Sequence, residues 1–168
     1  MQISRHATEW CVSNTMSELF GAHELDSLEG HITHWLLSMK ERNETIAAVD
    51  RGDIGERRWY VRMRGEEKEF TTVWLTLGQR TLRYETYVMP APEENAEQLY
   101  EHLLRRNESL VGAHFSIGIE DAIFLRGELP LRLVEEEELD RVIGTLYATV
   151  ERVFPVIIRI GFASRFAE

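Results

Sequence analysis

Two histidines placed three residues apart are the first candidates for chemistry, because imidazole nitrogen atoms bind metal ions. His31 and His34 lie in a segment with helical apolar spacing, so both imidazoles can share one face. A protein metal site needs three or more ligands and groups that orient them. Neither Glu29 nor Glu41 is placed to complete such a set. The sequence therefore predicts solvated surface histidines, and no bound metal or cofactor.

The other reactive side chains also lack partners in sequence. Cys11 is the single cysteine, and no cluster of Lys or Arg lies beside it to activate the thiol. His102 and His114 are accompanied by no Ser or Cys nucleophile motif. The acidic run Glu135–Glu138 stands at a helix start, where carboxylates are favourable without a ligand. Since Walker, Rossmann, zinc-protease and hydrolase motifs are also absent, we expect no catalytic residues and no enzyme.

One strand face mixes aromatic and basic side chains, as RNA-binding sheets do. Its members alternate along the chain: Arg58, Tyr60, Arg62 and Arg64. The formal net charge is −10, and a field of that sign repels phosphate backbones and anionic lipid surfaces. Pairing of Arg64 with Glu69 on the next strand is the ordinary alternative. We therefore expect neither nucleic acid nor membrane as a partner.

Composition indicates one globular domain. A chain of 168 residues with 43% hydrophobic residues can bury a core without disulfides or metals. A lone cysteine, no apolar run near the ~20 residues of a membrane span, and no apolar stretch at the N-terminus together favour a cytoplasmic location. Residues 1–25 lack a clear period, so we treat them as an extension or a short extra helix, and 26–168 as the single domain.

Periodicity and turn residues predict the elements of that domain. A capping box at Asp26–Glu29 opens a helix over 27–42, and Asp50–Gly55 forms a loop. A β-meander follows, and its strands cover 58–64, 70–77 and 82–89. Pro90-Ala-Pro92 starts a helix that ends near Asn107, and strands near 113–118 and 122–128 come next.

A last long helix opens at Glu135–Glu138. Pro155 is expected to end or kink this helix, and the apolar stretch 156–160 can be a helical continuation or a strand. The order α-β-β-β-α-β-β-α with short turns predicts an α+β fold in which helices pack on an antiparallel sheet.

The second strand of the meander carries the functional hypothesis. If Arg64 pairs with Glu69, Trp59 faces Trp74, and Val61 and Met63 face Thr72 and Phe70. Alternation then sends the aliphatic residues of the second strand to the opposite side, and that strand is apolar on both faces. Either the helices of this chain or a second protein must cover the additional face. The candidate protein-binding residues are Val73, Trp74, Leu75, Leu77, Tyr84 and Tyr87.

Several segments resemble the YbjN family over about residues 57–166. The matching segments are Trp59–Lys68, Phe70–Trp74, Arg83–Asn95, Leu103–Asn107, Phe124–Pro130 and Arg159–Phe166. The family is described as a regulator of sensory transduction, and its fold is similar to that of type III secretion chaperones. Those chaperones are small, acidic and usually dimeric, and they bind extended protein segments. The family has no established catalytic residues to transfer.

Two hypotheses follow. The first is a non-enzymatic, chaperone-like or regulatory protein that binds a protein partner or client segment, as a homodimer. The alternative is a small enzyme or small-molecule sensor with a cleft between sheet and helices. Its polar anchors would be Arg83, Tyr84, Glu85, Tyr87, Arg159 and Arg165. The role of the Gly161–Phe166 tail stays open between sealing the core and presenting a docking motif.

Overall fold

Helices and strands alternate along the chain in an α+β arrangement. The computed structural model describes residues 20–167, which form three α-helices and six strands. The helices are α1 (Ala22–Arg42), α2 (Ala96–Asn107) and α3 (Glu136–Gly161). The strands are β1 (Ile46–Arg51), β2 (Arg58–Arg64), β3 (Phe70–Leu77), β4 (Thr81–Met89), β5 (His114–Ile117) and β6 (Ile123–Pro130). The predicted fold class is confirmed, with one strand more than expected.

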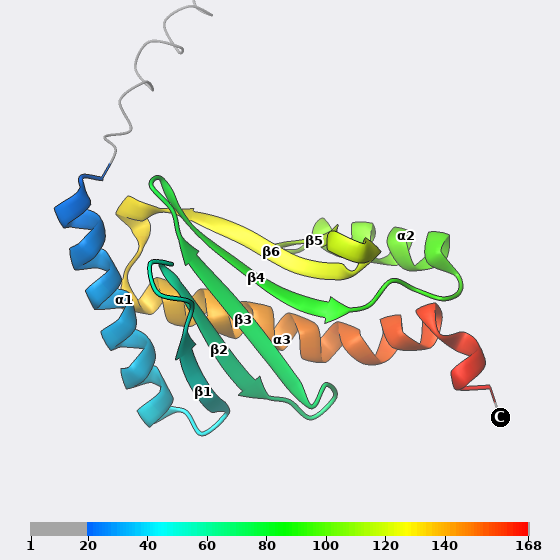
Figure 1. Cartoon of the computed structure of the whole chain (residues 1–168). Helices are drawn as coiled ribbons and strands as arrows, with labels where there is room; N and C mark the ends of the chain where they lie inside the picture. Colours follow the sequence, from blue (N-terminus) through cyan, green and yellow to red (C-terminus); the bar gives the residue numbers. More distant parts are fainter. Residues whose placement is uncertain (1–19, 168) are drawn as a thin grey trace, which may run out of the picture.

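All strands join one antiparallel sheet of order β1-β2-β3-β4-β6-β5. Figure 1 views this sheet from its outer side, with α3 running behind the strands. Trp59 of β2 donates its indole N–H to Thr33 of α1, and Leu99 and Leu103 of α2 join Phe115 of β5 in the same core. The three helices therefore pack against one face of the sheet, and the core lies between them and the strands.

Alternation along the strands decides which side chains enter this core. The inward residues of β2 are Trp59, Val61 and Met63, as predicted, and each is buried. Their partners across β3 are Leu75, Val73 and Thr71, and β4 adds Leu82, Tyr84, Thr86 and Val88. Helix α3 presents an apolar stripe to this surface, namely Leu139, Val142, Leu146, Val150, Val153 and Ile157.

The register between the first two meander strands differs from the prediction by one residue. Arg64 lies opposite Phe70, not Glu69, so Trp59 faces Leu75 and Val61 faces Val73. The cause is the turn between β2 and β3. There the amide of Gly65 donates to the carbonyl of Glu69, so Glu69 pairs with Gly65 and Phe70 becomes the partner of Arg64. Because a one-residue slip exchanges the faces of a strand, the aliphatic side chains of β3 join the inner face already formed by β2.

The boundaries of other helices and strands also differ from the prediction. The edge strand β1 includes the first two residues of the expected Asp50–Gly55 loop, and sequence periodicity missed it because its burial pattern is mostly intermediate. Helix α1 begins at Ala22, where Glu24 accepts the amide of Gly21 at 2.7 Å. The two residues that were expected to cap the helix form ion pairs instead. Asp26 and Glu29 bind Arg57 at 2.5 and 2.9 Å, respectively.

Helix α3 continues through Pro155 to Gly161. Of the two expectations for Pro155, that it ends or kinks the helix, the first is wrong, and 156–160 is the helical continuation. A proline inside a helix costs about 3 kcal/mol, mainly through a lost hydrogen bond and a ring clash. Burial of Val153 and Ile157 on either side of the proline offsets that cost.

The C-terminal tail packs back on the segment before α2. Phe162 is buried, and the carbonyl of Gly161 accepts the amides of Glu93 and Glu94. Arg165 pairs with Glu93, and Glu94 accepts the amide of Ser164 at 3.0 Å. Hydrogen bonding by the side chain of Ser164, and then by its backbone amide, lowers the pKa of the Glu94 carboxyl. Of the two readings of this tail, the structure supports the one in which it seals the core.

Candidate functional site

The outer face of the sheet has an aromatic row on it. We call it the open face and define it by the outward side chains of β2, β3, β4 and β6, because no helix within residues 20–167 covers it. Strand pairing places Tyr60 beside Trp74, and brings Tyr87 beside Phe124. Edge contacts then connect the rings, with centroid distances of 6.2 Å for Tyr60–Trp74 and for Trp74–Phe124, and 5.7 Å for Tyr87–Phe124.

The aromatic row is partly exposed to solvent. Phe124 is buried because Trp74, Tyr87 and the guanidinium of Arg126 surround it, the last at 4.9 Å from its ring centroid. Tyr87 is 38% exposed, and Tyr60 and Trp74 have intermediate exposure. Large rings held together in water-accessible positions are typical of binding surfaces, where they supply contact area at low entropic cost.

Arginines surround the rings in an otherwise acidic protein. Arg126 pairs with Glu85 at 3.5 Å, and Arg58 with Glu56 at 3.6 Å. Among the described residues, the other outward arginines of β2 and β4 have no ion-pair partner: Arg62, Arg64 and Arg83. The open face therefore offers guanidinium groups to acidic groups of a partner.

The structure divides the six candidate protein-binding residues between the two sides of the sheet. Trp74 and Tyr87 lie on the open face. The other four lie in the core under the helices and are at most 6% exposed: Val73, Leu75, Leu77 and Tyr84. Tyr60 and Phe124, which complete the row, were not among the candidates. Alternation along β2 and β6 was the signal that could have found them.

The turn between β2 and β3 is held by a carboxylate from α3. Glu151 accepts the backbone amides of Glu66, Glu67 and Lys68 at 2.7, 3.0 and 3.2 Å. A side chain on Gly65 would collide with this carboxylate, so glycine is required there. Hydrogen bonds to an ionised group are among the stronger ones in proteins, and these three fix the turn on the helix.

The side chain of Lys68 extends from this turn to β4. Its ammonium donates to the backbone carbonyl of Tyr87 at 2.5 Å, and lies 5.4 Å from the Tyr87 ring centroid and 5.9 Å from that of Phe154. Burial lowers the pKa of Lys68 to about 8, against the opposing effect of the Glu151 charge.

Lys68 gives stability a defined pH dependence. Between about pH 8 and pH 10.5, the ordinary pKa of a lysine amine, the unfolded chain binds more protons at Lys68 than the folded protein does, so raising the pH favours folding. Urea midpoints of the wild type should rise between pH 8 and about 9.5, and those of Lys68→Met should rise less. Burial raises the phenol pKa of Tyr84, Tyr87 and Tyr147, which acts with the opposite sign at higher pH. An identical pH dependence in both proteins would contradict this assignment.

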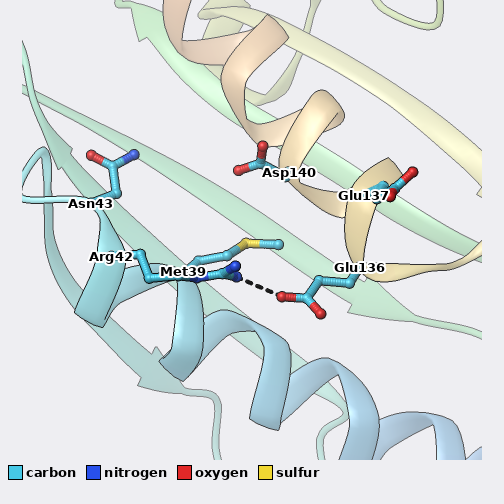
Figure 2. Close-up of a pocket in the computed structure, with 6 residues that line it drawn as sticks. All are labelled: Met39, Arg42, Asn43, Glu136, Glu137 and Asp140. Carbon is cyan, nitrogen blue, oxygen red and sulfur yellow. Dashed lines mark hydrogen bonds and ion pairs between the residues drawn. The ribbon is translucent and has the colours of Figure 1, made fainter.

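A polar cleft of about 490 Å³ separates the end of α1 from the start of α3. Figure 2 shows Arg42 of α1 paired with Glu136 of α3, an ion pair of 2.5 Å, and Asp140 and Glu137 also line this cleft. Glu138 binds Arg141 one turn later, and this contact lowers its carboxyl pKa. The acidic run therefore forms helix-start and ion-pair contacts, as its position predicted.

A second, apolar cleft of about 360 Å³ lies between α2 and β5. Its walls are Tyr100, Leu103, Leu104, Phe115, Ser116, Ile117 and Ile123. Leu104 and Ile117 stand at its rim, 68% and 51% exposed. The outer edge of β5 is capped, because the side chain of Asn107 bonds both the amide and the carbonyl of Phe115, at 2.7 and 3.2 Å.

The remaining sequence candidates are not brought together. His31 stacks on Trp35 with centroids 5.5 Å apart, and residues 20–167 contain no cluster of three or more potential metal ligands. Cys11 lies outside the described residues. No helix in the described part of the chain is long and apolar enough to span a membrane.

The anchors proposed for a cleft between sheet and helices are dispersed. Arg83 and Glu85 lie on the open face, Arg159 is exposed on α3, and Arg165 pairs with Glu93 in the tail. Tyr84 points into the core, and its hydroxyl donates to the carbonyl of Gly112 at 2.5 Å. The described structure therefore does not gather these six residues into one site.

Comparison with known proteins identifies a family. The model of the YbjN family, described as "Putative bacterial sensory transduction regulator", matches residues 31–159. The uncharacterized protein Mb0497 of Mycobacterium bovis is 35% identical over 104 residues, which are 62% of this chain and 57% of that protein. The uncharacterized protein ML2442 of Mycobacterium leprae is 33% identical over 107 residues, 64% of this chain and 58% of its own length. The matched region thus covers less than two thirds of these relatives.

Two solved structures are similar to this chain. One is a chain of the heterodimeric ExoU–SpcU complex from the type III secretion system of Pseudomonas aeruginosa, with a TM-score of 0.50 and 13% identity over 74% of this chain and 95% of that one. The other comes from the complex of the Yersinia pestis type III secretion chaperone SycH with a fragment of YscM2, with a TM-score of 0.48 and 14% identity over 73% and 96%. At this identity the likeness concerns the fold.

Proposed function

This chain belongs to the YbjN family, and from that premise and the geometry of the open face we propose that it is a non-enzymatic protein-interaction module with a chaperone-like or regulatory role. The observation that carries the proposal is the aromatic row on a sheet face that no described helix covers, in which Tyr60, Trp74 and Tyr87 are partly exposed around the buried Phe124. Monomeric proteins rarely leave such a patch without a partner.

The partner we infer is an extended segment of another protein that carries apolar and acidic side chains. The rings form a line across neighbouring strands, and an extended segment presents alternate side chains to such a line. Arg62, Arg64 and Arg83 flank it without ion-pair partners among the described residues, and they complement Asp and Glu. The chain from the ExoU–SpcU structure also occurs in a complex with another protein, which agrees with this role.

Selection from a phage-displayed library of random 12-residue peptides tests this function. We expect peptides with alternating apolar residues and Asp or Glu, and we expect Trp74→Ala to weaken their binding by about 30-fold or more. Trp35→Ala, at a tryptophan of intermediate exposure on α1, is the matched control and should bind normally. Peptides that bind Trp74→Ala undiminished, or tighter binding of a single-stranded RNA oligonucleotide to the wild type, would overturn the proposal.

We further propose that the module is a homodimer formed through the cleft between α2 and β5. A two-fold interface needs a projecting group and its receptor on the same patch. Leu104 projects beside an apolar cleft, so Leu104 of each copy can enter the cleft of the other. Because Asn107 caps the edge of β5, this contact uses side chains and no added strand pairing.

Light scattering after size-exclusion chromatography tests the dimer. The wild type should elute as a dimer, and Leu104→Glu should elute as a monomer because a carboxylate would have to be buried in an apolar cleft. Leu37→Glu on α1, at an exposed leucine far from this patch in sequence, should remain dimeric. A monomeric wild type at all concentrations, or a dimer that survives Leu104→Glu, would contradict the interface.

A further inference from the structure

The sheet divides beside Lys68. Strands β3 and β4 pair from Leu77 and Leu82 as far as Val73 and Thr86. The β2–β3 ladder continues to Phe70, and the β4–β6 ladder continues to Met89. Past Val73, then, β3 and β4 follow different neighbours, as their diverging ends in Figure 1 show. At this division the carbonyl of Tyr87 accepts the ammonium of Lys68.

The Lys68 ammonium is held there by a backbone carbonyl and not by an acidic side chain. No carboxylate lies within ion-pair distance of Lys68 among residues 20–167. Glu151 of α3 is the acid whose charge acts on it, and both oxygens of Glu151 are already bonded to the amides of the turn. The remaining neighbours are the rings of Tyr87 on β4 and Phe154 on α3.

We propose that Lys68 is a site of covalent acylation, at which the side-chain amine takes an acyl group from a thioester or an acyl phosphate. Half-buried between two rings, the side chain has its amine in a fixed position beside the open face. The lowered pKa of Lys68 supports the assignment, because it leaves a substantial fraction of the amine neutral near neutral pH.

The reaction needs no oxidant and no metal. The lone pair of the neutral Nζ attacks the carbonyl carbon, the C–N bond forms, and the C–S bond of a thioester or the C–O bond of an acyl phosphate breaks. The thiolate or phosphate leaves, and the amine proton passes to it or to water. The product amide is uncharged and retains one N–H for the Tyr87 carbonyl. Acylation thus replaces a cation beside Tyr87 with an apolar group.

The chain supplies its own control, because its only lysines are Lys40 and Lys68. Lys40 is exposed on α1. The full-length protein is incubated with acetyl-CoA or, separately, acetyl phosphate near pH 7.5, and mass spectrometry follows acetylation of both lysines over time. We expect Lys68 to react about tenfold faster than Lys40, because its larger neutral fraction outweighs its lower basicity and partial shielding. The two reagents identify which donor the site prefers.

A variant separates this environment from simple accessibility. Phe154→Ala removes one ring and admits water, which should raise the pKa of Lys68 and slow its acetylation several-fold. A lysine limited only by access would react faster in that variant. Equal or faster acetylation of Lys40 in the wild type, or faster acetylation of Lys68 in Phe154→Ala, would overturn the proposal. Neither readout depends on the binding function of the open face.

Discussion

Replacing Trp59 with alanine is expected to lower the free energy of unfolding by about 3–5 kcal/mol, while the same change at Trp74 costs about 1 kcal/mol. The two tryptophans lie on neighbouring strands but on opposite faces of the sheet. Trp59 is fully buried, donates to the Thr33 hydroxyl at 3.0 Å, and lies under the Arg51 guanidinium at 4.5 Å. Its removal leaves a cavity in the core and takes one hydrogen bond from the Thr33 hydroxyl, which still donates to the carbonyl of Glu29.

Urea unfolding followed by circular dichroism measures both changes, and similar m-values in the two variants would show that the comparison is valid. The pair also tests the strand register. In the register expected from sequence, Trp59 and Trp74 would share one face, and both variants would then lose a similar free energy. A cost at Trp74 equal to that at Trp59 would therefore contradict the one-sided sheet, and with it the open face.

Periodicity and turn residues were sufficient for most of the fold. Alternation placed Trp59, Val61 and Met63 on the inner face, and the apolar stripe of α3 was readable from its spacing. The strand β1 was not predicted because it is a short edge strand with two alanines and little full burial. The continuation of α3 through Pro155 could not be predicted from local propensity either, because it depends on the burial of Val153 and Ile157 in the core.

The candidate site was harder to predict than the fold, for one physical reason. Which side chains share a face depends on register, and register here depends on a turn held by Glu151, about 85 positions away in the chain. A shift of one residue placed the three β3 candidates Val73, Leu75 and Leu77 in the core and left Trp74 outside. Phe124 joins Trp74 and Tyr87 through the β4–β6 pairing, which sequence spacing alone does not determine.

The second large effect on stability is expected when glycine is replaced with alanine. We expect the change at Gly127 to destabilise the protein and the same change at Gly144 to stabilise it. Gly127 lies on β6 directly against the ring of Tyr84, and a Cβ there would come within 2.6 Å of its Cε2 and would also collide with the carbonyl of Gly112. That carbonyl is the acceptor of the Tyr84 hydroxyl, so ring and backbone hold each other and neither can move away easily. We expect Gly127→Ala to lose about 3 kcal/mol of stability, at the upper end of overpacking costs.

Gly144 is the matched control, because it is exposed within α3 and a Cβ there would meet no atom within 4 Å. Alanine at this position should stabilise the protein by about 0.5–1 kcal/mol, since glycine is the costlier residue in a helix interior. Thermal unfolding of the two variants measures the contrast. If Gly127→Ala were neutral, the close packing of β6 on Tyr84 would be wrong, and so would the β4–β6 register that brings Phe124 to the aromatic row. A stability change at Gly127 alone, with the expected gain at Gly144, would support both the packing under the sheet and the surface built on its other side.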